Sequence, residues 1–402
     1  MSNTPKIRFK GFTDDWEQRK FGDVGSVSMC KRIFKDETSD DGDIPFYKIG
    51  TFGGTPDAYI SRELFEEYKS KFSYPDEGDI LLSASGTIGR IVEYNGEEAY
   101  FQDSNIVWLK HDKSISNKFL KVLYPTVKWD GIEGSTIQRL YNDNFLKTRF
   151  LMPSLQEQEK LGDYFSQFDN LITLHQRKCD ETKELKKYML QKMFPTRLPD
   201  GQGNGETKPE IRFAGFTDDW EQRKVSELVD YSNGTGHEDY VLPEGKYELI
   251  TLKSISSEGE LVSSGKYVNE EFETLKQNTL IMMLSEQAKG MLGMTTVIPC
   301  DNRYVLNQRV AALTLHDKVS SKFLTKAINI KQSYFEQMGA GTKVQNISRG
   351  HVENCLIEIP KYDEQKQIGV FFDNLDNLIT LQNKKVEQCK QLKKYMLQNM
   401  FV

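Results

Sequence analysis

The chain has 402 residues, 38% of them hydrophobic and 28% charged, with a formal net charge of −6 at pH 7. This length predicts two or more domains, and no run of apolar residues approaches the ~18 that cross a membrane. The polar N-terminus does not resemble a secretory signal, and the five separated cysteines favour free thiols in a reducing cytoplasm. The acidic balance means that binding to nucleic acid would require a local basic face or a partner protein.

The first element of the chain is a short motif that occurs twice. PKIRFKGFTDDWEQRK at 5–20 returns as PEIRFAGFTDDWEQRK at 209–224, with 14 of 16 residues identical. Phe9, Phe12 and Trp16 supply apolar anchors, while the glycine and the aspartate pair are typical of turns and helix N-caps. We therefore expect the motif to be a fixed framework piece in both halves of the chain.

A variable segment follows each copy of the motif, at 21–152 and 225–359. DILLSASGTIGRIVEY and LIMML predict strands around glycine-rich turns, whereas SNKFLKVLY at 116–124 and SSKFLTKAI at 320–328 predict short helices that begin after serine. Mixed signals of this kind indicate two compact α+β domains whose sequences have diverged.

The third element is a long helix that is also repeated, at 153–194 and 360–401, with 22 of 42 residues identical. Apolar residues recur at steps near 3.5, the spacing of a coiled-coil seam. Roughly 38 helical residues span about 57 Å, and such a helix cannot bury its apolar stripe alone. We expect the copies to form an antiparallel coiled coil with pseudo-two-fold symmetry. The seam residues are Phe165, Phe168, Ile172 and Leu185 in the first copy and Phe372, Leu375, Ile379 and Leu392 in the second.

The order of segments predicts a division of the whole chain. Residues 1–152 and 209–359 form the globular domains, residues 153–194 and 360–402 form the repeated helices, and the glycine- and proline-rich residues 195–208 form a linker.

Catalytic signatures are missing from the sequence. MGAGTK at 338–343 has the wrong spacing for a phosphate-binding loop, and no two histidines have metal-ligand spacing. Asp200, Glu206 and Lys208 resemble the carboxylate and lysine set of a metal-dependent nuclease, but they lie in the linker and are not repeated. The sequence therefore predicts a binding protein with no metal site rather than an enzyme.

The variable segments share polar clusters beside predicted strands. The motif G-[ST]-x-[IV]-Q-x-[LI] begins at Gly134 and again at Gly341. Asparagine and glutamine can bond adenine, arginine can bond guanine, and lysine and tyrosine can hold phosphate; the alternative is that these side chains only stabilise turns. The candidate DNA-binding residues are Ser83, Ser85, Thr87, Arg90, Gln102, Asn105, Lys128, Gln138, Arg139 and Tyr141 in the first segment and Ser285, Gln287, Lys289, Asn307, Gln308, Arg309, Lys343, Gln345, Asn346 and Arg349 in the second.

The motifs W-E-Q-R-K, G-[ST]-x-[IV]-Q and P-x-x-x-E-Q, together with the tandem long helices, resemble the specificity subunit of type I restriction–modification enzymes. The resemblance covers essentially the whole chain. It implies that each variable segment is a target recognition domain for one half of a bipartite, asymmetric site in double-stranded DNA. It also implies that the coiled coil sets the spacer and docks two methylation subunits, and that two restriction subunits join for cleavage.

The same resemblance places S-adenosylmethionine, ATP and magnesium on those partner subunits and not on this chain. Two other functions remain open at this point. One is a coiled-coil scaffold whose paired domains bind proteins, and the other is a single-chain DNA methylase or nuclease. The first would not bind nucleic acid even with a methylation subunit present, and the second would need a cofactor pocket.

Overall fold

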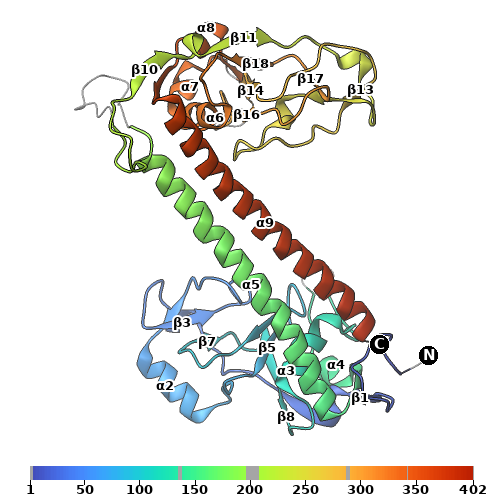
Figure 1. Cartoon of the computed structure of the whole chain (residues 1–402). Helices are drawn as coiled ribbons and strands as arrows, with labels where there is room; N and C mark the ends of the chain where they lie inside the picture. Colours follow the sequence, from blue (N-terminus) through green and yellow to red (C-terminus); the bar gives the residue numbers. More distant parts are fainter. Residues whose placement is uncertain (1–2, 135–137, 196–207, 287–289, 342, 402) are drawn as a thin grey trace. The chain divides into compact units, whose positions relative to one another are not determined.

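The computed structural model describes residues 3–134, 138–195, 208–286, 290–341 and 343–401. The chain divides into two compact units. Unit 1 comprises Met1–Gln176 with Lys384–Val402, and unit 2 comprises Arg177–Asn383. Each unit thus contains one globular module, the first part of the long helix that follows it, and the last part of the other long helix (Figure 1).

The module of unit 1 is α+β, and its main sheet has the strand order β2-β8-β5-β6 with antiparallel neighbours. These strands are Gly25–Ser28, Ile106–His111, Ile80–Ser83 and Ile91–Glu93. A second sheet has the order β4-β3-β7, with strands Tyr59–Ile60, Ile44–Tyr47 and Tyr100–Phe101, and β1 (Glu17–Lys20) pairs with β9 (Arg149–Met152). The helices of the module are α1 (Phe21–Val24), α2 (Arg62–Lys71), α3 (Asn117–Leu123) and α4 (Asn142–Lys147).

The module of unit 2 repeats this strand order although its sequence differs. Its main sheet is β11-β18-β14-β16, its second sheet is β13-β12-β17, and β10 pairs with β20. The main-sheet strands are Val229–Asn233, Val310–Leu315, Leu280–Met283 and Thr295–Val297. The other strands are β13 (Tyr267–Val268), β12 (Tyr247–Ile250), β17 (Tyr304–Leu306), β10 (Glu221–Lys224), β20 (Leu356–Ile359), β15 (Ser285–Glu286) and β19 (Gln345–Asn346). The helices are α6 (Ser321–Asn329), α7 (Gln332–Met338) and α8 (Arg349–Glu353).

The predicted local elements at the centre of both modules are confirmed. The runs ILLS at β5 and LIMM at β14 are buried along their whole length, as expected of strands in the middle of a sheet. The serine-initiated helices appear as α3 and α6, and the Ser320 hydroxyl accepts a hydrogen bond from the Phe323 amide at the start of α6.

The repeated helices are α5 (Leu155–Lys192) and α9 (Tyr362–Met400), and they contact each other in both units. In unit 1, Phe165 packs against Phe401, just beyond α9, and Asp169 pairs with Lys393 at 2.5 Å. In unit 2, Phe372 packs against Phe194, just beyond α5, and Asp376 pairs with Lys186 at 2.5 Å. In each unit, residues later in one helix contact residues earlier in the other, so the two helices are antiparallel. In the part of the chain that the structure describes, no helix has the length and hydropathy of a membrane span.

The helix seam follows a heptad pattern, but two of the predicted seam residues are wrong. Phe165, Phe168, Phe372, Leu375 and Ile379 are buried, and Ile172 is half-buried. Leu185 and Leu392 are instead 46% and 49% exposed. Steps of three and four residues from Cys179 and Val386, both buried, reach the half-buried Lys186 and Lys393. The seam therefore passes one residue beyond the two leucines.

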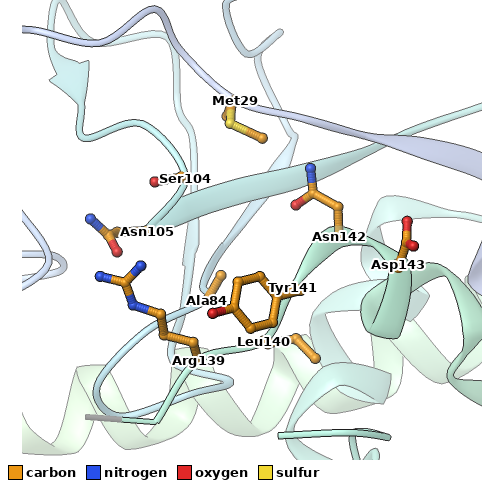
Figure 2. Close-up of a pocket in the computed structure, with 9 residues that line it drawn as sticks. All are labelled: Met29, Ala84, Ser104, Asn105, Arg139, Leu140, Tyr141, Asn142 and Asp143. Carbon is orange, nitrogen blue, oxygen red and sulfur yellow. The ribbon is translucent and has the colours of Figure 1, made fainter. Parts of the chain in front are cut away.

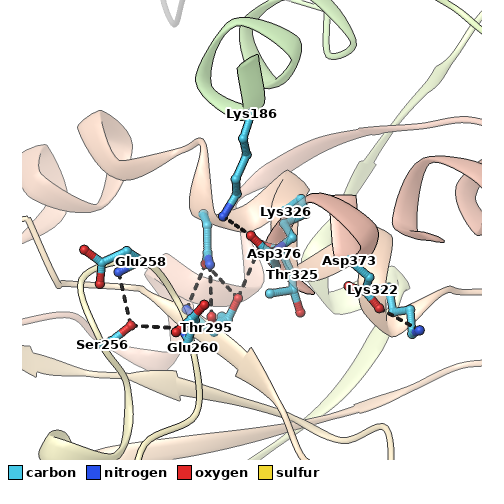
Figure 3. Close-up of polar contacts among 11 residues, drawn as sticks. Lys186, Ser256, Glu258, Glu260, Thr295, Lys322, Thr325, Lys326, Asp373 and Asp376 are labelled. Carbon is cyan, nitrogen blue, oxygen red and sulfur yellow. Dashed lines mark hydrogen bonds and ion pairs between the residues drawn. The ribbon is translucent and has the colours of Figure 1, made fainter. Parts of the chain in front are cut away.

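Lysine is tolerated at these seam positions because each one meets an aspartate on the other helix. In unit 2, Asp376 binds Lys186 of α5 at 2.5 Å and Lys326 of α6 at 2.6 Å (Figure 3). All three side chains are less than 20% exposed. A charged pair inside an apolar seam penalises other pairings that would leave either charge buried alone, so it favours a single helix register.

In each unit, a buried ion pair joins the duplicated motif to the start of the long helix. The Arg8 guanidinium donates two hydrogen bonds to the Glu157 carboxylate, at 2.7 and 2.8 Å. Arg212 and Glu364 repeat this contact at 2.6 and 2.7 Å. Both carboxylates are only 1% exposed.

The glutamine that follows each carboxylate ties the helix to its own module. In unit 1, the Gln158 side chain accepts a hydrogen bond from the Ser116 amide at 2.8 Å and donates one to the Pro153 carbonyl at 3.0 Å. Gln365 makes the equivalent bonds to Ser320 and Pro360. The E-Q pair thus fixes the direction in which each long helix leaves its module.

The tryptophan of the motif holds the end of the other long helix. Trp16 packs edge-on against Phe401 with ring centroids 5.8 Å apart, and Trp220 does the same with Phe194 at 5.9 Å. The Ile7 amide also donates to the Asn399 carbonyl at 2.9 Å, so the terminal segments lie side by side in unit 1 (Figure 1). The motif therefore contacts both the start of the long helix that follows its module and the end of the other long helix.

Replacing Arg8 with alanine should destabilise unit 1 by about 3–5 kcal/mol, because the Glu157 carboxylate would remain buried without its partner. Urea denaturation of the purified chain measures this loss. Arg19→Ala is the matched control, since Arg19 and Glu17 are 44% and 66% exposed, and it should cost about 0–1 kcal/mol. Equal effects of the two substitutions would contradict the conclusion that the buried Arg8–Glu157 pair stabilises unit 1.

Candidate nucleic-acid interface

Three sequence clusters that were predicted separately meet at the end of β5 in unit 1. The Ala84 amide donates to the Asn105 carbonyl at 2.7 Å, and the Leu140 amide donates to the Ala84 carbonyl at 2.8 Å. Ser85 forms a β-bridge with Arg139. Residues from distant parts of the segment are thereby held together by backbone hydrogen bonds.

An open pocket of about 480 Å³ lies at this junction. Of the predicted residues, Asn105, Arg139 and Tyr141 line it, and Figure 2 shows their polar ends around one hollow. Leu140 belongs to the repeated G-[ST]-x-[IV]-Q-x-[LI] motif, and Ser104 lies between the predicted Gln102 and Asn105, so both come from the predicted polar clusters. The remaining lining residues were not predicted from the sequence and are Met29, Ala84, Asn142 and Asp143.

Other candidates in unit 1 shape the backbone around the pocket instead of lining it. Ser83 is 1% exposed, and its hydroxyl donates to the Thr87 carbonyl and accepts from the Arg90 amide. The Arg90 side chain donates to the Phe52 carbonyl, and the Gln102 side chain accepts from the Ile49 amide. These contacts indicate structural roles for Ser83, Arg90 and Gln102. Thr87, Lys128 and Gln138 are exposed, and Ser85 is buried.

Unit 2 has the same backbone arrangement at the end of β14. The Leu284 amide donates to the Arg309 carbonyl at 3.0 Å, and the Ile347 amide donates to the Leu284 carbonyl at 3.0 Å. Ser285 pairs with Asn346 as Ser85 does with Arg139. Leu284 therefore corresponds to Ala84, Arg309 to Asn105 and Asn346 to Arg139.

Several candidates of unit 2 are bonded within the protein. Asn307 is 5% exposed; its side chain accepts from the His237 amide and donates to Glu238, each at 3.1 Å. Gln308 donates to Glu238 at 2.6 Å, and this hydrogen bond holds the pKa of that carboxyl below its usual range. The Ser285 hydroxyl donates to Asn346 at 2.5 Å. Asn307 thus has a structural role rather than a reading role.

The remaining candidates of unit 2 differ in how freely they can reach a ligand. The Arg349 guanidinium donates to Glu353 at 2.7 Å and lies over the Tyr231 ring at 5.2 Å. Arg309 and Lys343 are exposed, and Gln345 is half-buried. Gln287 and Lys289 lie outside the described residues, as do Ser135, Ile137 and Thr342 of the repeated turn motif.

The described residues contain no group of three or more histidine, cysteine, aspartate or glutamate residues placed to hold a metal ion. Burial raises the pKa of the Cys30 and Cys355 thiols to about 12, so both remain protonated near neutral pH. The polar and cationic groups at the ends of β5 and β14 are instead of the types that contact base edges and phosphates.

Comparison with known proteins gives concordant matches. The family model for the type I restriction modification DNA specificity domain matches residues 13–184 and 217–391. A putative type I restriction enzyme specificity subunit from Haemophilus influenzae is 58% identical over 153 residues, which cover 38% of this chain and 40% of that protein. The putative MjaX specificity subunit of Methanocaldococcus jannaschii is 22% identical, with 98% of this chain and 95% of that protein covered.

Solved structures show the same fold over the full length. The crystal structure of the S subunit of a type I restriction–modification system from M. genitalium has a TM-score of 0.65 at 15% identity, covering 99% of both chains. A structure concerned with complex assembly and conformational transition of a type I system has a TM-score of 0.52 at 13% identity, covering 97% of this chain and 98% of that one.

Replacing Asn307 with alanine should lower the stability of unit 2 by about 1–3 kcal/mol, because the His237 amide would lose its acceptor in a buried place. Asn105→Ala is the matched control: that side chain lies at an open pocket, and its loss should change stability by at most about 0.5 kcal/mol. Urea denaturation of both variants tests the distinction. A larger loss for Asn105→Ala would contradict this distinction between a buried structural asparagine and an asparagine at an open pocket.

Proposed function

Because the chain belongs to the family of DNA specificity subunits of type I restriction–modification systems, we propose that each module reads one half of a bipartite, asymmetric DNA site. This proposal rests on the equivalent backbone arrangement at the ends of β5 and β14. Backbone hydrogen bonds are the same around Ala84 and Leu284, yet the exposed side chains beside them differ. A constant support with different side chains suits two modules that read different sequences through the major groove.

The long helices supply the second part of the proposal, which is the docking of partner subunits. Large apolar residues on α5 are exposed at Leu171, Leu174, Leu185 and Tyr188. Each has an identical, exposed counterpart at an offset of 207 residues on α9: Leu378, Leu381, Leu392 and Tyr395. The seam does not use these side chains, and exposed apolar groups of this kind mark protein interfaces.

The distribution of these residues points to two copies of one partner. Unit 1 carries Leu171 and Leu174 from α5 with Leu392 and Tyr395 from α9, and unit 2 carries the equivalent set. The ion pair of Asp169 with Lys393 places the two helix segments of unit 1 at the same level. We propose that each set docks one methylation subunit and that two restriction subunits join the assembly for cleavage.

In this proposal, the methylation and restriction subunits carry out the chemical reactions. S-adenosylmethionine, ATP and magnesium would bind the methylation and restriction subunits, and the complex would act in the cytoplasm. The net charge of −6 suits this division, because a methylation subunit that encloses the duplex would supply the phosphate contacts that this chain lacks overall. The antiparallel helices would set the spacer between the half-sites.

Exchanging residues 21–152 for the equivalent segment of a related specificity subunit should change one half of the methylated sequence and leave the other half unchanged. The physical reason is that each module reads DNA with side chains from its own strand end. Mapping methylated adenines across a genome, with the chain co-expressed with its methylation subunit, measures both halves at once. Simultaneous change of both half-sites would contradict independent modules.

Replacing Leu185 and Leu392 together with aspartate should weaken binding of the methylation subunit at least ~10-fold, while the stability of the free chain changes by at most about 0.5 kcal/mol because both side chains are exposed. Val370→Asp is the matched control on α9, since Val370 is 50% exposed and its repeat equivalent is Asp163. Analytical ultracentrifugation of mixtures gives affinity and stoichiometry. Full binding by the double variant would exclude this surface.

A further inference from the structure

The two modules carry an arginine and an asparagine in reversed positions. In unit 1, Asn105 precedes β8 and Arg139 bridges to Ser85. In unit 2, Arg309 precedes β18 and Asn346 pairs with Ser285. The backbone hydrogen bonds to Ala84 and Leu284 make these positions equivalent in pairs, so the arginine comes from a different neighbouring segment in each module.

The guanidinium groups of Arg139 and Arg309 are both free to contact a ligand. Arg139 and Arg309 are exposed, and within the described ranges neither side chain makes a hydrogen bond or an ion pair with another residue. Arg349 differs, since its guanidinium is held by Glu353. Figure 2 shows the Arg139 guanidinium beside Asn105 at the pocket, with the Tyr141 ring next to it.

The asparagine of unit 2 is bonded to the protein. Its side-chain oxygen accepts from the Ser285 hydroxyl at 2.5 Å, and its nitrogen donates to the Val344 carbonyl at 3.2 Å. Asn346 thus supports the strand end. In unit 2, the side chain that remains free to contact a ligand is therefore that of Arg309.

The backbone at Arg309 strengthens this assignment. Its φ angle is +65°, in the left-handed region that non-glycine residues enter at a cost of roughly 1–2 kcal/mol. A glycine or an asparagine would adopt this conformation more easily. A costly backbone conformation at an exposed arginine is a reason to seek a function for its side chain.

Resting on the proposed function, we infer that one guanine in each half-site is read by a single arginine supplied from non-equivalent segments: Arg139 in unit 1 and Arg309 in unit 2. A guanidinium donates two parallel hydrogen bonds to O6 and N7 of guanine in the major groove, a pattern that no other base presents there. The position of the guanine within each half-site then depends on which segment carries the arginine.

The test uses the complex of the full chain with its methylation subunit. The wild-type motif is first mapped from methylated adenines, and duplexes with single base changes are then used for binding. Arg139→Ala should reduce the preference for guanine over other bases ~5- to 150-fold at one position of one half-site, and Arg309→Ala should do so in the other half-site.

The double variant Asn105→Arg/Arg139→Asn should move the guanine requirement within the first half-site and leave the second half-site unchanged. This exchange is compatible with the fold, because the new asparagine can bond to Ser85 as Asn346 does to Ser285. Arg19→Ala and Arg223→Ala are the matched controls in the two modules, since each lies in the repeated W-E-Q-R-K motif and pairs with a glutamate of its own module, and both should keep the wild-type motif.

Three results would overturn the inference. One is an unchanged motif in both arginine variants, and another is a single variant that alters both half-sites. The third is uniform weakening on all duplexes with a salt slope reduced by about one, which identifies a phosphate contact. A wild-type complex without a bipartite site would instead refute the proposed function, so the two failures are distinguishable.

Discussion

The buried bond between the motif arginine and the carboxylate at the start of the long helix is the constraint on which the rest depends. Arg8 with Glu157 and Arg212 with Glu364 are bidentate pairs whose carboxylates are 1% exposed. Neither partner can be lost alone without leaving a buried charge. The neighbouring glutamines fix the helix to the module, and the motif tryptophans receive the end of the other helix. This accounts for repetition of the framework sequence while the modules diverge.

Within that framework, the strand ends of the two modules have the same backbone support, while the exposed side chains beside them differ. The amide and carbonyl of Ala84 and of Leu284 make equivalent hydrogen bonds, and these bonds do not depend on the side chains at positions such as Arg139 or Asn346. The Arg139 side chain can therefore change without disturbing the sheet, whereas the Asn346 side chain also supports its strand end through bonds to Ser285 and Val344. The exposed apolar residues on the outer helix faces are instead identical in the two repeats, as a partner that binds in two copies would require.

Sequence alone predicted the repeats, the α+β modules, β5, β14 and the antiparallel helices. The repeats follow from identical residues at a fixed offset, and the strands and helices follow from local periodicity. The pairing of the long helices follows from the need of each one to bury its apolar stripe. It placed Leu185 and Leu392 in the seam, where the heptad steps instead reach Lys186 and Lys393. Local pattern could not show that Ser83 and Asn307 are buried structural residues, or that Asn142 and Asp143 join the pocket. These properties depend on strand pairing between residues far apart in the chain.

The most direct test of the account is the insertion of one heptad into both helices at the unit boundaries, after Gln176 in α5 and after Asn383 in α9. Each insertion adds ~10 Å, the length of about three base pairs at ~3.4 Å each. If the helices set the distance, the methylome keeps both half-site sequences and shows a spacer about three base pairs longer. An unchanged spacer with full methylation, or altered half-sites, would contradict the view that the helices set distance while the modules read sequence.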